Sequence, residues 1–271
     1  MRRRNAHIGV FGVGFPFNTC VFKKHPKVAI GVMSKRKERR EKAELFAKVR
    51  GAAQSPAEAE KFPAGHDGVA VTDDILATSE QLASLVISTQ PRELPRMKKF
   101  RFQLLHAWIV AHLSPSRVAD VGGGKGLLAY LLQESGWQAT VIDPISQDLP
   151  AKFKDLSTNR QTRIPNKVTV PRLVCPFELE MAGDFDLLVA MHAHGCNIQL
   201  IRAAAEFGRE AILLPCCVIG EPLIPPPGVH WIQALVDVAV QNGFTVEPFR
   251  LNFKGQNIGL YLRPRLDTLE M

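Results

Sequence analysis

The sequence lacks several features that would place it in other protein classes. No apolar run approaches the length that spans a bilayer, and the start of the chain has neither the apolar core nor the cleavage site of a signal peptide. We see no internal repeat. The cysteines are odd in number and follow no framework spacing: Cys20, Cys175, Cys196, Cys216 and Cys217. These absences predict a cytoplasmic protein with reduced thiols.

Acidic residues are missing from the first 37 positions, which contain Arg2, Arg3 and Arg4 among other cations. Such a segment suits an organelle-targeting tail or an RNA-binding arm. A third interpretation, which we favour, is that translation starts at Met33. The sequence that follows Met33 has the pattern of an ordinary charged helix, whereas the preceding segment has no clear pattern.

The stretch ADVGGGKGLLAYLL, residues 119–132, places four glycines between a buried apolar run and an amphipathic helix pattern. A strand-to-helix turn of this kind presents bare backbone and a helix N-terminus to a cofactor. The dinucleotide fingerprint requires a small residue where Leu127 stands, which argues against NAD. Lys125 is followed by glycine instead of Ser or Thr, which argues against a nucleoside triphosphate.

A second acidic residue of interest is Asp143, which ends the run ATVID, rich in β-branched residues. It lies one strand–helix–strand step after Asp120. A carboxylate at the exposed tip of a second strand can accept both hydroxyl hydrogens of an adenosine ribose.

These residues resemble motifs one and two of the class I S-adenosylmethionine-dependent methyltransferases, whose first motif is D/E-x-G-x-G-x-G. The resemblance extends over roughly residues 98–264. It implies an α/β fold, a doubly wound, mostly parallel seven-stranded sheet that ends in an antiparallel hairpin. It also implies that S-adenosylmethionine is the cofactor. The cofactor-binding residues implied are Asp120, Gly122, Gly123, Gly124, Gly126, Asp143 and Met191.

The later elements can be interpreted independently of the resemblance. We predict strands at 185–191 and 210–219, and a helix from Asn197, as its N-cap, to Gly208. A helix ending at Gly243 precedes two strands whose connection is too short for a helical crossover, so those strands must be antiparallel. We predict a methyltransferase domain over 96–265, an N-terminal basic extension and linker with short helices over 1–95, and a tail over 266–271.

The net charge of +8 is concentrated in clusters. Basic residues gather at 35–42, at 92–101, and at 152–167, where we expect the third helix and strand. Phe100 and Phe102 lie within or beside the second cluster, and cations interleaved with aromatic rings suit a phosphate backbone with stackable bases. The clusters predict RNA as a partner, against the alternative that they are solvated helix faces.

Catalytic groups are expected where the fourth and fifth strands end, in MHAHGCN and PCCVIGEP. The residues assigned to catalysis are His192, His194, Asn197 and Cys216. A histidine could orient the acceptor or take its proton; a cysteine could attack a pyrimidine ring; or the side chains could be structural. A further alternative is a metal site, because the histidines and cysteines are zinc-compatible ligand types; we assign no metal ligand, because two adjacent cysteines on a strand point to opposite faces and would not both bind one ion.

MHAHGC and LPCC also resemble the branch of class I methyltransferases that includes the eukaryotic tRNA ribose methyltransferases. The sequence departs from that branch at His194, where the branch has cysteine, and at Val218 and Ile219, where histidines are often found. No [DNS]-P-P-[YFW] motif is present, which disfavours methylation of adenine N6. The resemblance implies a methyltransferase acting on tRNA. The alternatives are methylation of a protein side chain or small molecule, and a low-turnover cofactor- or RNA-binding factor.

Overall fold

The computed structural model describes residues 35–54 and 97–265. The domain boundary predicted at residue 95 therefore lies outside the described residues. So do the basic start, the linker, the tail after residue 265, and Cys20. Within the described residues no helix has the length and apolar character needed to cross a membrane.

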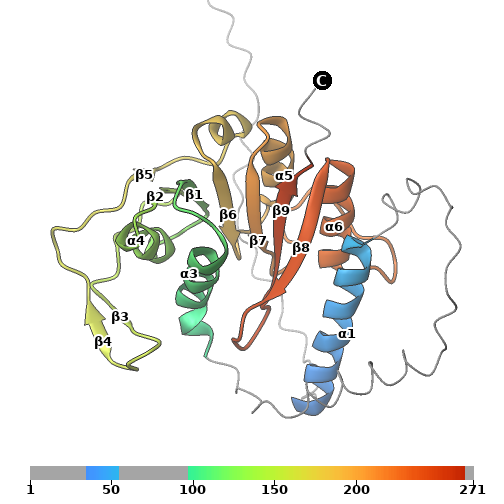
Figure 1. Ribbon diagram of the computed structural model, residues 1–271, viewed down its shortest axis with the longest axis horizontal. Helices are drawn as coiled ribbons and strands as arrows, with labels where there is room; N and C mark the ends of the chain where they lie inside the picture. Colours follow the sequence, from blue (N-terminus) through green and yellow to red (C-terminus); the bar gives the residue numbers. More distant parts are fainter. Residues whose placement is uncertain (1–34, 55–96, 266–271) are drawn as a thin grey trace, which may run out of the picture.

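A seven-stranded sheet forms the centre of the fold (Figure 1). Its strand order is β5-β2-β1-β6-β7-β9-β8, with the first five strands parallel and β9 antiparallel to both β7 and β8. The predicted α/β architecture with a closing antiparallel pair is confirmed. The strands are β1 Arg117–Val121, β2 Gln138–Ile142, β5 Arg172–Leu173, β6 Leu187–Met191, β7 Glu210–Leu214, β8 Phe244–Arg250 and β9 Ile258–Pro264.

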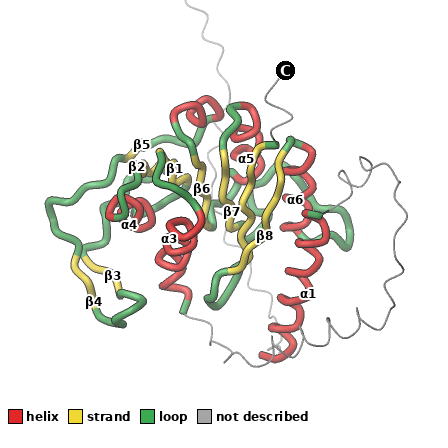
Figure 2. The backbone as a smooth tube through the Cα atoms, in the orientation of Figure 1, coloured by secondary structure: helices red, strands yellow, loops and turns green. Residues whose placement is uncertain are grey.

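Helices cover both faces of the sheet (Figures 1 and 2). Apolar residues of α3 and α4 pack in one core cluster with one side of the strands, and those of α1, α5 and α6 pack in a second cluster with the other side. Because every strand at the centre is buried on both faces, β6 consists of apolar residues only. The helices are α1 Lys35–Ala53, α3 Arg101–His112, α4 Leu127–Glu134, α5 Asn197–Glu206 and α6 Trp231–Gln241, with the short turns η1 Lys98–Phe100 and η2 Leu179–Asp184.

The charged helix α1 belongs to the same core as the sheet. Val49 is fully buried, and Leu45 and Phe46 pack against the cluster that includes α6. Figure 1 shows α1 beside α6 at the β8 edge. Part of the predicted N-terminal extension therefore contributes to the packing of the sheet.

The segment 152–163 corrects a prediction. It forms an antiparallel hairpin of β3, Lys152–Lys154, and β4, Gln161–Arg163, where we expected a helix and a strand of the main sheet. Asp155 closes the turn by accepting hydrogen bonds from Thr158 and Ser157, and Asn159 adopts a left-handed φ of 56°. These bonds lower the pKa of Asp155 to about 2. The third strand of the sheet is the two-residue β5 instead.

The carboxyl ends of the parallel strands lie at one edge of the sheet. The chain runs outward from β1 through β2 to β5, and then returns to place β6 and β7 on the other side of β1. The order therefore reverses between β1 and β6, which is where open α/β sheets bind ligands.

Candidate functional site at the sheet switch point

The glycine turn connects β1 to α4 and touches the loop after β6. Gly122, Gly124 and Gly126 have φ values of 66°, 55° and 77°. A Cβ on Gly122 would lie 2.7 Å from the Cβ of Ala193, so this position admits only glycine without a shift of one loop. The glycines expected from the motif thus occupy the conformations that require them.

Asp120 lies beneath the turn with an unsatisfied carboxylate oxygen. The residue is 1% exposed, and its Oδ2 has no hydrogen-bond partner among the described residues. Burial raises the pKa of Asp120 to about 7. A Cβ on Gly123 would collide with this carboxylate, so the absence of a side chain there leaves the carboxylate its space.

Asp143 ties two turns together at the end of β2. Its Oδ2 accepts from the N–H of Gly124 at 2.9 Å, and its Oδ1 accepts from the N–H of Ile145 at 2.8 Å. Asp143 is 7% exposed, so the expectation of an exposed strand tip is wrong. Each oxygen retains acceptor capacity, because a carboxylate offers about four lone-pair sites.

Arg172 was not singled out from the sequence, yet it supports the same turn. It begins β5, and its Nη1 donates to the carbonyl oxygen of Gly124 at 2.8 Å. Together with Asp143 it holds both the N–H and the C=O of Gly124. No sequence motif marks an arginine that begins a two-residue strand.

His192 is the first residue after β6 and carries a free imidazole. Its φ of 56° is unusual for a non-glycine residue, and neither ring nitrogen has a partner within the part of the chain that the structure describes. Burial, with smaller contributions from the positive charges of Lys98 and Arg101, lowers the pKa of His192 to about 4. The ring is therefore neutral at pH 7 and presents a free lone pair.

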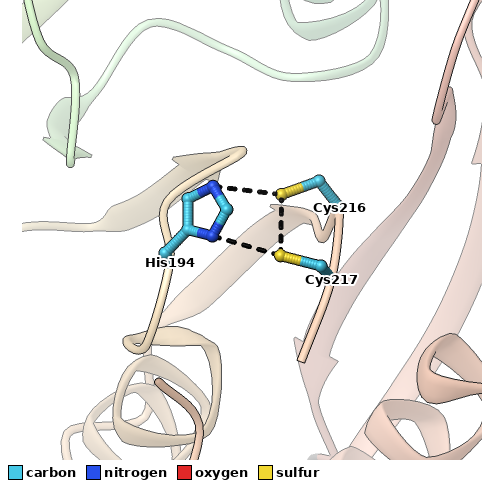
Figure 3. A group of neighbouring side chains, drawn as sticks. All are labelled: His194, Cys216 and Cys217. Atoms are coloured by element: carbon cyan, nitrogen blue, oxygen red, sulfur yellow. Dashed lines mark hydrogen bonds between the residues drawn. The ribbon is translucent and has the colours of Figure 1, made fainter. Parts of the chain in front are cut away.

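His194, Cys216 and Cys217 form a compact cluster (Figure 3). Nδ1 of His194 lies 3.1 Å from Sγ of Cys217, Nε2 lies 3.5 Å from Sγ of Cys216, and the two sulfurs are 3.6 Å apart. Both sulfurs face the imidazole, so the expectation that the cysteines point to opposite faces is wrong. The strand predicted for 210–219 ends at Leu214 in the structure, because Pro215 has no N–H to donate. Both cysteines therefore follow the strand in a loop. Burial raises the pKa of Cys216 to about 11, which opposes the hypothesis of a free cysteine nucleophile.

Asn197 opens α5 but is not its N-cap, which is Cys196. Its Nδ2 donates to Oε1 of Glu221 at 2.6 Å and to the carbonyl of Ala193 at 3.2 Å. Glu221 also accepts from the backbone N–H groups of Asn197 and Ile198, and so takes the capping role from 24 residues away. This contact fastens the cysteine loop to the loop that contains both histidines.

The remaining predicted site residue, Met191, is 6% exposed and packs in the core cluster with Leu214 and Phe253. A cavity of about 800 Å³ lies between α3, α4 and the β3–β4 hairpin. Its lining contains neither the glycine turn nor the histidine–cysteine cluster. The candidate site is therefore defined by its side chains and not by that cavity.

The sequence matches no family model and no curated protein. Solved structures similar to this chain include a 1,6-didemethyltoxoflavin-N1-methyltransferase of Burkholderia thailandensis with bound S-adenosylhomocysteine (15% identity, 77% of this chain and 98% of that chain, TM-score 0.37). A second similar structure is a ribosomal protein L11 methylase of Lactobacillus delbrueckii subsp. bulgaricus (19% identity, 60% of this chain and 78% of that chain, TM-score 0.39). A third is the magnesium protoporphyrin IX methyltransferase of Synechocystis PCC 6803 with bound S-adenosylmethionine (14% identity, 86% of this chain and 99% of that chain, TM-score 0.36). At these scores the likeness assigns neither an activity nor a substrate to this chain.

Proposed function

We propose that the chain is an S-adenosylmethionine-dependent methyltransferase that acts on RNA, with tRNA as the first candidate. The observation that carries the proposal is the buried carboxylate of Asp120 beneath the glycine turn at the switch point of the sheet, because its Oδ2 has no hydrogen-bond partner among the described residues. A buried carboxylate oxygen without a donor costs free energy, about 1–3 kcal/mol or more for a charged group. A ligand that brings a cationic donor to this turn would recover that cost.

S-adenosylmethionine fits the residues present. Its amino group is such a donor for Asp120, and the ribose hydroxyls suit the remaining acceptor capacity of Asp143. The glycine turn lets the ligand approach bare backbone. When bound, this cofactor supplies an activated methyl group on a sulfonium.

His192 is proposed to act on the acceptor. It follows β6, directly across the switch point from Gly122, whose Cβ position touches the neighbouring Ala193. A neutral imidazole with a free nitrogen can accept the proton of an acceptor hydroxyl or nitrogen as the methyl group is transferred. His194, Asn197 and Cys216 complete this side of the site, where Asn197 positions the loop through Glu221.

RNA is favoured as the acceptor by the cations on this side of the site. Lys98 and Arg101 are close enough to His192 to lower the pKa of its imidazole. Nε of Arg101 is buried and has no partner within the described ranges, and its guanidinium lies 4.3 Å from the ring of Phe102. Phosphate oxygens pair with exposed cations, and Lys98 and Lys99, which precede this arginine in the chain, are exposed. The exposed cations of the β3–β4 hairpin, Lys152 and Arg163, extend the positive charge.

The cluster at 35–42 supports this proposal less. Arg40 pairs with Glu44 at 2.7 Å, and Lys42 pairs with Glu38 at 2.6 Å, both along the exposed face of α1. Such i,i+4 pairs are typical of a solvated helix face. The RNA interface is therefore assigned to η1, the start of α3 and the hairpin.

The test is transfer of a radiolabelled methyl group from S-adenosylmethionine into total RNA, into protein and into a small-molecule extract. We expect label in a small RNA band. His192→Asn, which keeps a residue that tolerates the left-handed backbone, should lower transfer about 10²- to 10⁴-fold and leave S-adenosylhomocysteine affinity unchanged. His106→Asn, at a half-buried histidine that bonds Ser135, is the matched control.

Each outcome decides between hypotheses. Label only in protein or small molecules would refute RNA as the acceptor and retain the methyltransferase. No label despite tight cofactor binding would refute the enzyme in favour of a binding factor. Equal losses of transfer and cofactor affinity in His192→Asn would return His192 to a structural role.

A further inference from the structure

The loops after β6 and β7 bring one imidazole and two thiols to the same point from positions more than 20 residues apart. The loops also touch through their backbones: a Cβ on Gly195 would lie 3.0 Å from the carbonyl oxygen of Gly220, and both glycines have positive φ. Glu221 fastens the second loop to the start of α5. The three side chains are therefore held by a braced pair of loops and do not depend on one flexible segment.

We infer that His194, Cys216 and Cys217 form a zinc site with one coordination position open. The three possible ligand atoms lie within 4.8 Å of one another. In a tetrahedral zinc site with Zn–S of about 2.3 Å and Zn–N of about 2.0 Å, two sulfurs are about 3.8 Å apart and a sulfur and a nitrogen about 3.5 Å apart. Here the two sulfurs are 3.6 Å apart, and each lies near a different nitrogen of the ring: Cys217 Sγ is 3.1 Å from Nδ1 and Cys216 Sγ is 3.5 Å from Nε2.

The orientation of the ring indicates what must move. Figure 3 shows the imidazole edge that carries both nitrogens turned toward the two sulfurs. One nitrogen can bind an ion placed between the sulfurs after a rotation of the ring about its bond to Cβ. His194 is exposed, so this rotation meets little resistance from packing.

The chemistry of the cluster selects the metal. Two thiolates and one neutral imidazole are soft and borderline ligands, which suit zinc, whereas magnesium and calcium require oxygen ligands. Two thiolates also neutralise the charge of one divalent ion. The nearest carboxylate in the braced loops, Glu221, is engaged by α5 and does not compete.

Three protein ligands leave the fourth tetrahedral position to water or to another molecule, as in zinc sites that carry out chemistry. The neighbouring His192 has two buried ring nitrogens without a hydrogen-bond partner among the described residues. The inference of metal binding itself does not rest on the proposed function.

The test uses the full chain, purified under reducing conditions and stripped of metal. We expect one zinc ion per chain after zinc loading, and a thiolate-to-metal charge-transfer absorption when cobalt(II) is added, which zinc abolishes. Cys216→Ser, Cys217→Ser and His194→Ala should each raise the dissociation constant for zinc at least about 10- to 100-fold, the loss found when even an outer-shell partner is removed. Cys175→Ser, at a half-buried cysteine outside the cluster, should bind zinc as the parent does.

Controls keep the result interpretable if a variant folds poorly. Each metal-free variant is compared with the parent by thermal unfolding and by S-adenosylhomocysteine binding. Zinc affinities are then compared only for variants that match the parent in both measurements. Absence of metal binding by the reduced parent would overturn the inference, as would a disulfide between Cys216 and Cys217 that persists under reduction. Retention of zinc by all three ligand variants, or an equal loss in Cys175→Ser, would also overturn it. Failure of methyl transfer with intact zinc binding would count only against the proposed function.

Discussion

Replacement of Asp143 by asparagine tests the glycine turn most sharply. The carboxylate accepts one backbone N–H at each oxygen, from Gly124 at 2.9 Å and from Ile145 at 2.8 Å, and it is 7% exposed. Asparagine preserves the shape but offers one oxygen, so its NH₂ group faces an N–H donor. One hydrogen bond to a charged acceptor is lost, which costs about 1.5–3 kcal/mol.

The lost hydrogen bond should weaken cofactor binding for two reasons. It loosens the turn that is proposed to bind the cofactor, and it changes the carboxylate that is proposed to bind the ribose hydroxyls. We expect S-adenosylhomocysteine affinity to fall about 10- to 150-fold, since every 1.4 kcal/mol is a factor of ten. Isothermal titration calorimetry measures the change, and Asp148→Asn, at an exposed position in the loop that follows, is the control. An affinity within about twofold of the parent would refute both the role of Asp143 and the assignment of the turn.

Three further predictions concern the stability of the same framework, measured by urea unfolding. Gly122→Ala should lower the free energy of unfolding more than Gly136→Ala, because Gly136 has a positive φ but nothing within 4 Å, so its cost is limited to about 1–2 kcal/mol of backbone strain; equal costs would refute the contact between the glycine turn and the β6 loop. Because the folded pKa of Asp120, about 7, exceeds its ordinary value of 3.8, this carboxyl lowers stability as pH rises from about 4 to about 7, whereas His192, with its pKa lowered to about 4, raises stability over the same range; Asp120→Asn should therefore make the free energy of unfolding rise more steeply with pH, and an unchanged slope would refute the raised pKa of Asp120. Glu221→Ala should cost about 1–3 kcal/mol by leaving α5 without its acceptor, whereas Glu206→Ala, at an exposed position of the same helix, should change stability by less than about 0.5 kcal/mol.

The sheet could be predicted from the sequence wherever local chemistry is decisive. The glycines after β1 are required by positive φ values, and the short connection between β8 and β9 permits only antiparallel pairing. Buried apolar runs mark β6 and the start of β7. In each case a short segment carries enough information to determine its own structure.

The misassigned elements depend on contacts that are distant in sequence or on turn chemistry. Asn197 has the residue type of an N-cap, but Glu221 supplies the acceptor from another loop. The 152–163 hairpin is fixed by the hydrogen bonds of Asp155, which the basic composition of the segment obscured.

The geometry of the site was predicted only in part. The sequence placed His192, His194 and Cys216 at neighbouring strand ends, because parallel strands share their carboxyl edge. The prediction failed for the cysteine pair, because β7 ends at Leu214, before Pro215, and the two thiols therefore lie in a loop where both can face the same point. Arg172 was missed because its partner, the carbonyl of Gly124, becomes a neighbour only when β5 joins the sheet.

The most direct test of the central claim is equilibrium binding of S-adenosylmethionine, NAD and ATP to the parent chain under the same conditions. The account predicts that S-adenosylmethionine binds at one site per chain and that NAD and ATP do not displace it. No binding of S-adenosylmethionine, or its displacement by NAD or ATP, would contradict the assignment of the glycine turn and with it the proposed methyltransferase.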